Sequence, residues 1–497
     1  MTEKLRAIMA LDPDRTEIDF EGIDYSWRQI AENVGAIEAA LDAMGLPEDA
    51  RIGVMLRNRP GHVAAIVAVL STDRCLVTLN PILPDAKLFA DVEALGLPVI
   101  IADATDLARA GLAEALDRAG SAVIEVGPRL EGVRVVQSEA RTAIPVSPGV
   151  AIEMLTSGTT GSPKRVPLSR DAFDASFRGF TRYERGRSFD DPPQLNSGCT
   201  MIVNPLTHIG GIYGCIGALA AGRKIALLEK FSVETWVAAV KRNRPAVAPA
   251  VPSAVRMLLD ADVNREDLSS LKALISGTAP LSPDLVDAFL EKYGIPICAN
   301  YGATEFAGAI AGWTIDDFRA RWAEKRGAVG RVHGDIEARI VDPENGAALP
   351  TGEEGLLELK GRQLNNDLQW MRTTDRAILD DDRFLFIRGR ADNAIIRGGF
   401  KVHPDDIVHA LNDHPAIREA AVVGVPDERL GAVPAAAIIL KDGVDALAPD
   451  DLKAWLRERL IAYQVPAHIR IVADFPRTPS MKPSAPGLRA LFEGGAA

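Results

Sequence analysis

The pattern of apolar and polar residues changes sharply around residue 150. An apolar run, VAIEML at residues 150–155, precedes a stretch rich in glycine, serine and threonine, and RVPL follows at residues 165–168. Short apolar runs of this kind are typical of strands, and Pro167 argues against a helix directly after the polar stretch. The pattern therefore predicts a strand, a loop and a second strand.

A second pattern, at residues 272–305, predicts a strand, a helix and a parallel strand. The apolar runs 272–276 and 295–299 flank a helical segment in which Ser282 can cap the start, Pro283 suits the first turn and Gly294 can end the helix. Strands joined in this way run parallel, so the loops GTAP and NYGATE should emerge at the same carboxyl edge, where ligands bind.

A third apolar strand ends in polar residues near His208, within TMIVNPLTHIGG at residues 200–211. We expect the three loops to converge on one cleft. In that cleft, Tyr301 offers a flat face for a base, Thr304 a hydroxyl group, and Glu305 an oxygen ligand suited to Mg²⁺. The simpler interpretation is that the tyrosine belongs to the core and the glutamate to the solvated surface.

The composition narrows the class of protein. A chain of 497 residues with 47% hydrophobic residues can bury more than one core, which predicts a multi-domain globular protein. The net charge of −12 is spread along the chain, which argues against a nucleic-acid partner. The sequence shows no signal peptide and no transmembrane segment, so we expect a cytoplasmic protein. The four cysteines, at positions 75, 199, 215 and 298, are too dispersed to indicate a zinc site or a disulfide framework.

The glycine-rich loop differs from the phosphate loop of the NTPases. Gly158 opens the GxxxxGK[ST] spacing, but Pro163 replaces the second glycine and Arg165 replaces the serine or threonine. Two glycines still allow backbone N–H groups to face inward, and Lys164 adds a positive charge, so the loop could bind a polyphosphate. The alternative is a flexible turn without a ligand.

Six motifs in a fixed order resemble the adenylate-forming superfamily of acyl-CoA synthetases, adenylation domains and luciferases. They are TSGTTGSPKR, SGTAPLS, NYGATE, RTTD, GRADNAIIRGGFKVHPDDI and PRTPSMK. The resemblance implies a large N-terminal α/β domain of several β-sheet subdomains, residues 1–391, and a small mobile α+β C-terminal domain, residues 392–497. In the latter, the pattern predicts helices near 404–411 and 450–460 and strands near 420–425 and 435–440. The resemblance also places the hinge at Asp392.

The resemblance implies a role for each site residue. The phosphate loop that binds ATP would comprise Thr156, Ser157, Gly158, Thr159, Thr160, Gly161 and Lys164. The adenine site would comprise Gly277, Thr278, Ala279, Asn300, Tyr301 and Gly302. The ribose site would comprise Asp375 and Arg390. Thr304 and Glu305 would attend the α-phosphate and Mg²⁺, His208 would line the acyl pocket, and Gly398 and Gly399 would admit the pantetheine arm of coenzyme A. Lys482 would be the catalytic lysine.

The implied reaction has two steps. A carboxylate attacks the α-phosphate of ATP to give acyl-AMP and pyrophosphate, and the thiol of CoA then displaces AMP. Two alternatives stay open: a stand-alone enzyme that loads an acyl carrier protein, and a non-catalytic nucleotide sensor. The sequence is also compatible with a homodimer.

The residues near His208 suggest the kind of acid. NPLTHIGGIYGCIGAL contains no acidic residue to pair with an amino-acid ammonium group. Small and apolar residues predict room for a bulky fatty or aromatic acid. These are Gly210, Gly211, Gly214, Gly217, Ala303, Phe306, Ala307, Ala309 and Trp313.

Two positions depart from the family pattern. Thr374 stands where Thr-Gly-Asp has its glycine, and Met481 stands where a glycine usually precedes the catalytic lysine. We expect the first to alter the backbone beside the ribose and the second to restrict the turn before Lys482.

Overall fold

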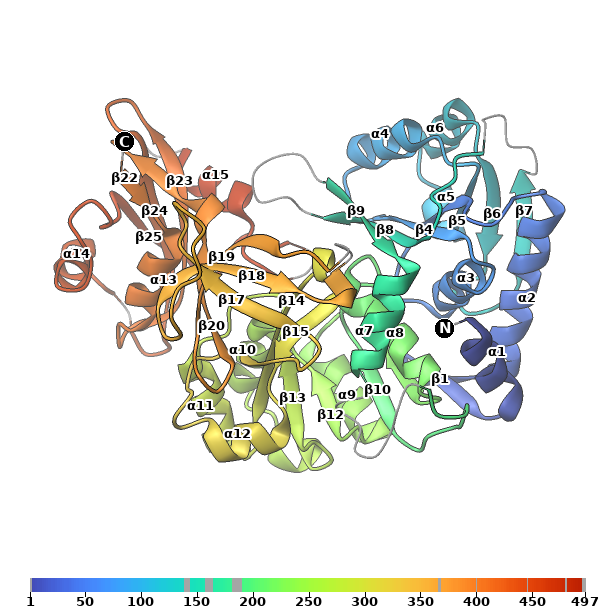
Figure 1. Cartoon of the computed structure of the whole chain (residues 1–497), viewed down its shortest axis with the longest axis horizontal. Coiled ribbons are helices and arrows are strands. Elements are labelled where there is room, and N and C mark those ends of the chain that lie inside the picture. The colour runs from blue at the N-terminus through green and yellow to red at the C-terminus, as the bar shows by residue number, and fades with distance from the viewer. Residues whose placement is uncertain are drawn as a thin grey trace. The chain divides into compact units, whose positions relative to one another are not determined.

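The computed structural model describes residues 2–137, 144–156, 164–180, 190–364, 368–398, 400–444, 446–478 and 481–493 (Figure 1). Within these residues the chain forms two compact units. The first unit lies within 1–157, 162–337 and 360–369, and the second comprises mainly 338–359 and 370–497. No helix in the described part of the chain is long and apolar enough to cross a membrane.

The first unit contains a seven-stranded sheet whose central strands are parallel. Its order is β7 (Val133–Gln137), β6 (Ala122–Val126), β5 (Val99–Ala102), β3 (Arg51–Met55), β4 (Cys75–Leu79), β8 (Val150–Thr156) and β9 (Lys164–Ser169). The end strands β7 and β9 pair antiparallel with their neighbours. The strand, loop and strand arrangement predicted around residue 160 is thus confirmed for its two strands.

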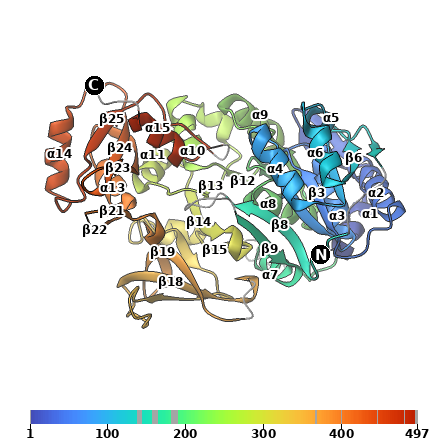
Figure 2. The ribbon, with the colours of Figure 1, turned by 90° about the horizontal axis from the view of Figure 1, so that it is seen from above.

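Helices cover both faces of this sheet. Successive side chains of a strand point to opposite faces, and on each face they join a separate apolar cluster. Ile52 and Val54 join one cluster with α1 (Thr2–Leu11), α2 (Trp27–Ala43) and α3 (Pro60–Ser71). Val77 and Ile100 join the other with α4 (Asp85–Leu95) and α6 (Leu112–Ala119), and Figure 2 shows β3 between the two helical layers. The short helix α5 (Ala104–Leu107) follows β5.

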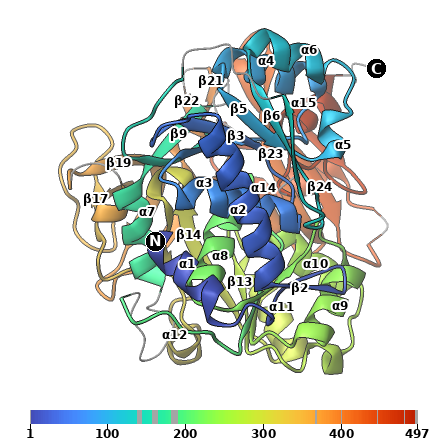
Figure 3. The same cartoon turned by 90° about the vertical axis from the view of Figure 1, so that its right-hand side faces the viewer.

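Two further sets of strands complete the first unit. The order of the smaller sheet is β10 (Cys199–Ile202), β11 (Lys224–Leu227), β1 (Thr16–Phe20) and β2 (Ile23–Ser26). The other set is β12 (Val247–Pro249), β13 (Ala273–Ser276), β14 (Ile297–Ala303), β15 (Gly308–Gly312) and β16 (Gly330–Val332). The helices of this region, several of which Figure 3 shows, are α7 (Arg170–Phe180), α8 (Ile209–Ala220), α9 (Val233–Asn243), α10 (Pro252–Asp260), α11 (Pro283–Tyr293) and α12 (Ile315–Arg321).

The second unit contains strands β17 (Glu337–Val341), β18 (Glu354–Lys360), β19 (Met371–Leu379) and β20 (Phe384–Arg390), and a separate sheet nearer the C-terminus. That sheet has the order β22 (Phe400–Val402), β21 (Ile395–Arg397), β24 (Gly431–Leu440) and β23 (Ile417–Asp427), with β25 (His468–Ile471) also paired to β24. Helices α13 (Pro404–Asn412) and α14 (Pro449–Arg457) pack on one face, and α15 (Ala485–Glu493) packs on the other (Figure 2).

The predicted C-terminal elements agree with these bounds, except that α14 ends at Arg457 and the strands extend beyond the predicted ranges. The fold class, a large α/β region of several sheets followed by a smaller α+β region, is confirmed. The predicted boundary between residues 391 and 392, and the mobility of the smaller part, stay predictions.

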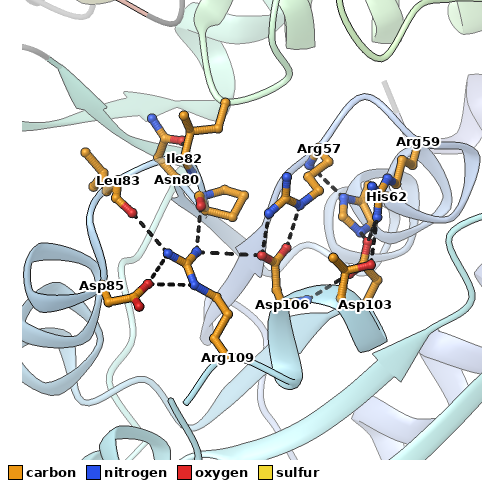
Figure 4. A network of polar contacts seen from close by, with 12 residues as sticks. Arg57, Arg59, His62, Asn80, Ile82, Leu83, Asp85, Asp103, Asp106 and Arg109 are labelled. Atoms are coloured by element: carbon orange, nitrogen blue, oxygen red, sulfur yellow. Dashed lines mark hydrogen bonds and ion pairs between the residues drawn. The ribbon is translucent and has the colours of Figure 1, made fainter. Parts of the chain in front are cut away.

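A buried network of charged side chains lies beyond the carboxyl ends of β3 and β5 (Figure 4). Arg57 donates to both oxygens of Asp106 at 2.8 and 2.6 Å, and Arg59 pairs with Asp103 at 2.5 Å. His62 accepts the backbone N–H of Arg57 at Nδ1. Burial alone would raise the pKa of Asp103, but His62, the Asp106 backbone N–H and Arg59 lower it instead. At this edge of the sheet, Arg57 and Arg59 are therefore each paired with an aspartate.

Candidate active site

The two ends of the glycine-rich loop are held together by β8 and β9. Thr156 and Lys164 pair directly across the antiparallel ladder, and the Thr156 hydroxyl donates to the Lys164 carbonyl at 3.1 Å. The Lys164 side chain is exposed. The predicted loop residues Ser157, Gly158, Thr159, Thr160 and Gly161 lie outside the described residues, and the paired strands fix only where that loop begins and ends.

Gly277 lies directly against Asn300, which brings two of the sequence motifs together. β13 and β14 are parallel neighbours, as predicted, and α11 begins at Pro283 and ends before Gly294 in a left-handed cap. A Cβ atom on Gly277 would lie 2.0 Å from Oδ1 of Asn300. Because Gly277 has no side chain, the Asn300 amide can occupy this space.

The prediction that NYGATE forms a loop is wrong in part. β14 continues through Ala303 because residues 300–303 pair with β15 in the antiparallel direction. A Cβ on Gly302 would lie 2.3 Å from the carbonyl oxygen of Gly308, so this close pairing requires glycine. Only Thr304 and Glu305 leave the strand, in a 3-10 helix at Thr304–Phe306. Thr278 and Ala279 follow β13 at its carboxyl end, and Thr278 has a left-handed φ of 69°.

Two buried polar side chains that the sequence did not reveal support the turn after Glu305. Ser176 donates to the carbonyl of Ala307 at 2.7 Å, and Gln363 donates to the carbonyls of Phe306 and Ala309 at 2.9 and 3.1 Å. Both are almost fully buried. They act as positioning residues for the segment that carries Thr304 and Glu305.

Glu305, the residue expected to bind Mg²⁺, is exposed. Clusters of three or more histidine, cysteine, aspartate or glutamate side chains that could hold a metal are absent from the described ranges. Mg²⁺ at nucleotide sites takes only one or two carboxylates, with phosphate oxygens and water as its other ligands. A single carboxylate at Glu305 therefore fits the ion.

His208 is the N-cap residue of α8, not part of a long loop. The preceding segment is fixed by Asn58, whose amide donates to the carbonyl of Asn204 at 3.1 Å and accepts the N–H of Leu206 at 2.8 Å. Gly211 lies inside the helix, where a Cβ would be only 2.2 Å from the carbonyl oxygen of Pro205. Close packing, and not room for a substrate, explains that glycine.

Asp375 and Arg390, the two residues expected at the ribose, form a directly opposed pair on β19 and β20. The guanidinium of Arg390 donates to the Thr374 hydroxyl at 2.7 Å and to both oxygens of Asp392 at 2.9 and 2.7 Å. Arg390 holds the pKa of Asp392 below its usual range. Thr374, which replaces the family glycine, thus adds a hydrogen bond between Arg390 and β19.

Gly398 has a left-handed φ of 56° and donates its N–H to the carbonyl of Leu430 at 2.8 Å. Gly399 lies outside the described residues. Lys482 is an exposed residue, but protein atoms lie around its amine. Loss of solvation to the surrounding protein lowers the pKa of its amine, and the positive charge of Arg390 lowers it further. Asp375, Arg390, Gly398 and Lys482 all belong to the second unit, whereas the other described site residues belong to the first.

Comparison with known proteins defines the class. The model of the AMP-binding enzyme family matches residues 5–366, and that of the AMP-binding enzyme C-terminal domain matches residues 407–482. The chain belongs to this family of adenylate-forming enzymes, which includes the acyl-CoA synthetases.

Individual relatives extend over nearly the whole chain. 4-Coumarate–CoA ligase 3 of Oryza sativa subsp. japonica is 27% identical over 497 residues, covering 95% of this chain and 88% of the relative. The amide bond synthetase McbA from Marinactinospora thermotolerans is 27% identical, with a TM-score of 0.80 and 99% of both chains covered. The ATP-bound RpMatB-BxBclM chimera B3 has a TM-score of 0.83 at 24% identity, again over 99% of both chains, which supports the fold.

Substitution of Gly277 by alanine should weaken ATP binding without unfolding the protein. The new Cβ would displace the Asn300 amide, and the end of this side chain can rotate away at little cost. Loss of one hydrogen bond of about 1–1.5 kcal/mol should raise the KM for ATP roughly tenfold. The KM for ATP should rise no further in the double variant Gly277→Ala/Asn300→Ala than in Asn300→Ala alone. Additive increases in KM would show that Gly277 does not act through Asn300.

Proposed function

We propose that the protein is an AMP-forming acid–CoA ligase that activates a hydrophobic fatty or aromatic carboxylic acid. Each unit supplies one supporting observation: Gly277 lies against Asn300 in the first unit, and Asp375 opposes Arg390 in the second. The family resemblance assigns both pairs to nucleoside binding. The family assignment and the similarity to 4-coumarate–CoA ligases agree with this chemistry.

In the proposed first step, an oxygen of the substrate carboxylate attacks the α-phosphorus of ATP and pyrophosphate leaves. Lys164 and the glycine-rich loop would neutralise the β- and γ-phosphates, and Thr304 would donate to the α-phosphate. Mg²⁺ held at Glu305 would supply further neutralisation of phosphate charge. Asp375 would accept hydrogen bonds from the ribose hydroxyls, while Arg390 offers donors beside it. Lys482 would stabilise the negative charge shared by the carboxylate and phosphate.

In the proposed second step, the thiol of CoA attacks the acyl carbonyl and AMP leaves. Gly398 and Gly399 would let the pantetheine arm approach the backbone closely. No covalent acyl-enzyme is required. The buried thiols of Cys75, Cys215 and Cys298 suit this scheme, because burial raises the pKa of each to about 12 and makes them poor nucleophiles at neutral pH.

The proposal of a hydrophobic acid rests on residues in β14 and directly after it. Phe306 and Ala307 are buried beside the turn that carries Glu305, and Tyr301 lies 6.0 Å from Phe306, measured between ring centroids. Trp313 contributes less than its sequence suggests. Its indole donates to the carbonyl of Ala328 at 2.8 Å and packs against Phe318 and Trp322, which makes it a core residue.

The substrate class can be tested with a panel of carboxylic acids, measuring AMP formation with and without CoA. Cinnamate-type and medium-chain acids should be preferred over acetate and amino acids. A clear preference for acetate or for an amino acid would contradict the proposed acyl pocket.

One relative suggests an alternative acceptor for the second step. McbA, an amide bond synthetase, is as similar to this chain as the plant ligases are, at 27% identity. An amine could therefore replace CoA, and an acyl carrier protein is a third acceptor. Preformed acyl-adenylate should be offered CoA, simple amines and a phosphopantetheinylated carrier in parallel, since the fastest acceptor identifies the second half-reaction.

The pH dependence of adenylation should report Lys482. Its protonated amine is the active form, and its pKa lies below the ordinary value of 10.5, so the rate should fall as the pH rises through that lowered pKa. Lys482→Arg should keep partial activity and move this falling limb to higher pH, because arginine stays protonated. An identical alkaline limb in the two proteins would assign the titration to another group.

A further inference from the structure

The turn before Lys482 contains an unfavourable backbone conformation. Met481 has φ of 63°, in the left-handed region that glycine adopts readily. For a residue with a Cβ atom this conformation costs about 1–2 kcal/mol. The strain lies immediately before the proposed catalytic lysine, so some contact must hold the turn in this shape.

Backbone and side-chain hydrogen bonds of Thr478 close the turn. The N–H of Met481 donates to the carbonyl of Thr478 at 2.8 Å, and the N–H of Thr478 donates to the carbonyl of Lys482 at 2.8 Å. The N–H of Lys482 donates to the Thr478 hydroxyl at 3.2 Å. These bonds hold Met481 and Lys482 against Thr478.

The Arg477 side chain attaches Met481 to the rest of the second unit. Its guanidinium donates to both oxygens of Glu419 at 3.4 and 2.8 Å, and to Asp474 at 3.2 and 3.0 Å. The same group donates to the carbonyl of Met481 at 3.3 Å. Its side chain is only 14% exposed, so solvent weakens these ionic contacts less than at an open surface. Glu419 lies on β23, which ties the turn to the sheet.

We propose that Arg477 is a positioning residue for Lys482: it clamps the carbonyl of Met481 and thereby stabilises the left-handed turn that a glycine would form without help. The inference rests on the proposed function only for the role of Lys482. The clamp itself is a property of the fold, and it compensates for the methionine at position 481.

The kinetic test is a double-mutant cycle on the two half-reactions. Arg477→Gln should slow acyl-adenylate formation about tenfold, while transfer from supplied acyl-adenylate stays within twofold. Met481→Gly should leave adenylation equal or faster. The double variant should recover most of the loss, because glycine adopts the left-handed conformation without the clamp. The matched control is Arg457→Gln, an exposed arginine in the same unit, which should change neither step.

Hydrogen exchange of the Met481 and Lys482 amides provides a readout that needs no activity. Arg477→Gln should accelerate exchange at both positions several-fold, and Glu419→Gln should do so to a smaller extent, whereas Arg457→Gln should not. Unchanged exchange in Arg477→Gln would overturn the clamp even if the protein adenylates as proposed. Equal loss in both half-reactions, without recovery by Met481→Gly, would also overturn it, since a general structural defect would then explain the data. Accelerated exchange in a protein without adenylation activity would support the clamp and reject only the proposed function.

Discussion

Replacement of Lys482 by alanine is expected to slow acyl-adenylate formation by about two to three orders of magnitude, the effect of removing one preorganised donor from a transition state. Transfer of the acyl group from supplied acyl-adenylate should be largely preserved. In the proposed two-step reaction Lys482 would act on charge that develops only while pyrophosphate leaves, so the second step would not need it. The measurement is pyrophosphate release in a single turnover, followed by thioester formation from synthetic acyl-AMP.

The control for this experiment is Lys441→Ala, which removes an exposed lysine from the same unit and should leave both steps unchanged. Near-normal pyrophosphate release in Lys482→Ala would mean that Met481 has misdirected the turn and that Lys482 is only a surface charge. Loss of both steps together, with a lower melting temperature, would instead indicate a folding defect.

The sequence predicted those elements whose boundaries are set by neighbouring residues. Helix α11 begins at Pro283 and ends before Gly294, as the sequence indicates, although the Ser282 side chain makes no capping hydrogen bond. The two strands around the glycine-rich loop were also predicted, because apolar runs with a proline after the loop leave few alternatives. The glycine at position 277 was singled out for its motif, and the contact with Asn300 gives a physical reason for it.

Features that depend on distant partners could not be predicted in this way. Residues 300–303 extend β14 because β15 pairs with them, and the pattern of NYGA alone does not show that pairing. Gln363 is 57 residues away in the chain from Phe306, whose carbonyl it binds, and Ser176 is 131 residues away from Ala307. Single polar residues of this kind have no local signature. Conversely, Gly211 and Trp313 fitted a substrate pocket by composition, yet their contacts are those of packed core residues.

The buried charge network was likewise not predicted, because no motif in the sequence marks its residues. Asp103 and Asp106 follow β5, and Arg57 and Arg59 follow β3, so parallel pairing of these two strands brings them together. Such a network contributes to stability only when every charge is paired, because each unpaired buried charge retains its full desolvation cost.

Asp106→Ala is therefore expected to destabilise the first unit by about 3–5 kcal/mol, as for other buried ion pairs that lose one partner. The Asp106 side chain is 0% exposed and binds Arg57 through both oxygens, with Arg109 also at 3.7 Å. Since the Arg57 side chain is 22% exposed, water can solvate part of the orphaned charge and the loss should fall near the lower end. The measurement is chemical denaturation followed by tryptophan fluorescence.

The matched control is Asp14→Ala, which removes the same two-oxygen contact from Arg28 at the surface, where both side chains are more than half exposed. Exposed pairs contribute little, so its unfolding midpoint should barely move. Adding Arg57→Leu to Asp106→Ala should recover part of the lost stability, because the orphaned guanidinium is then removed and an apolar side chain replaces it. Equal, small effects of Asp106→Ala and Asp14→Ala would show that water reaches the network, and the desolvation argument for this edge of the sheet would then be wrong.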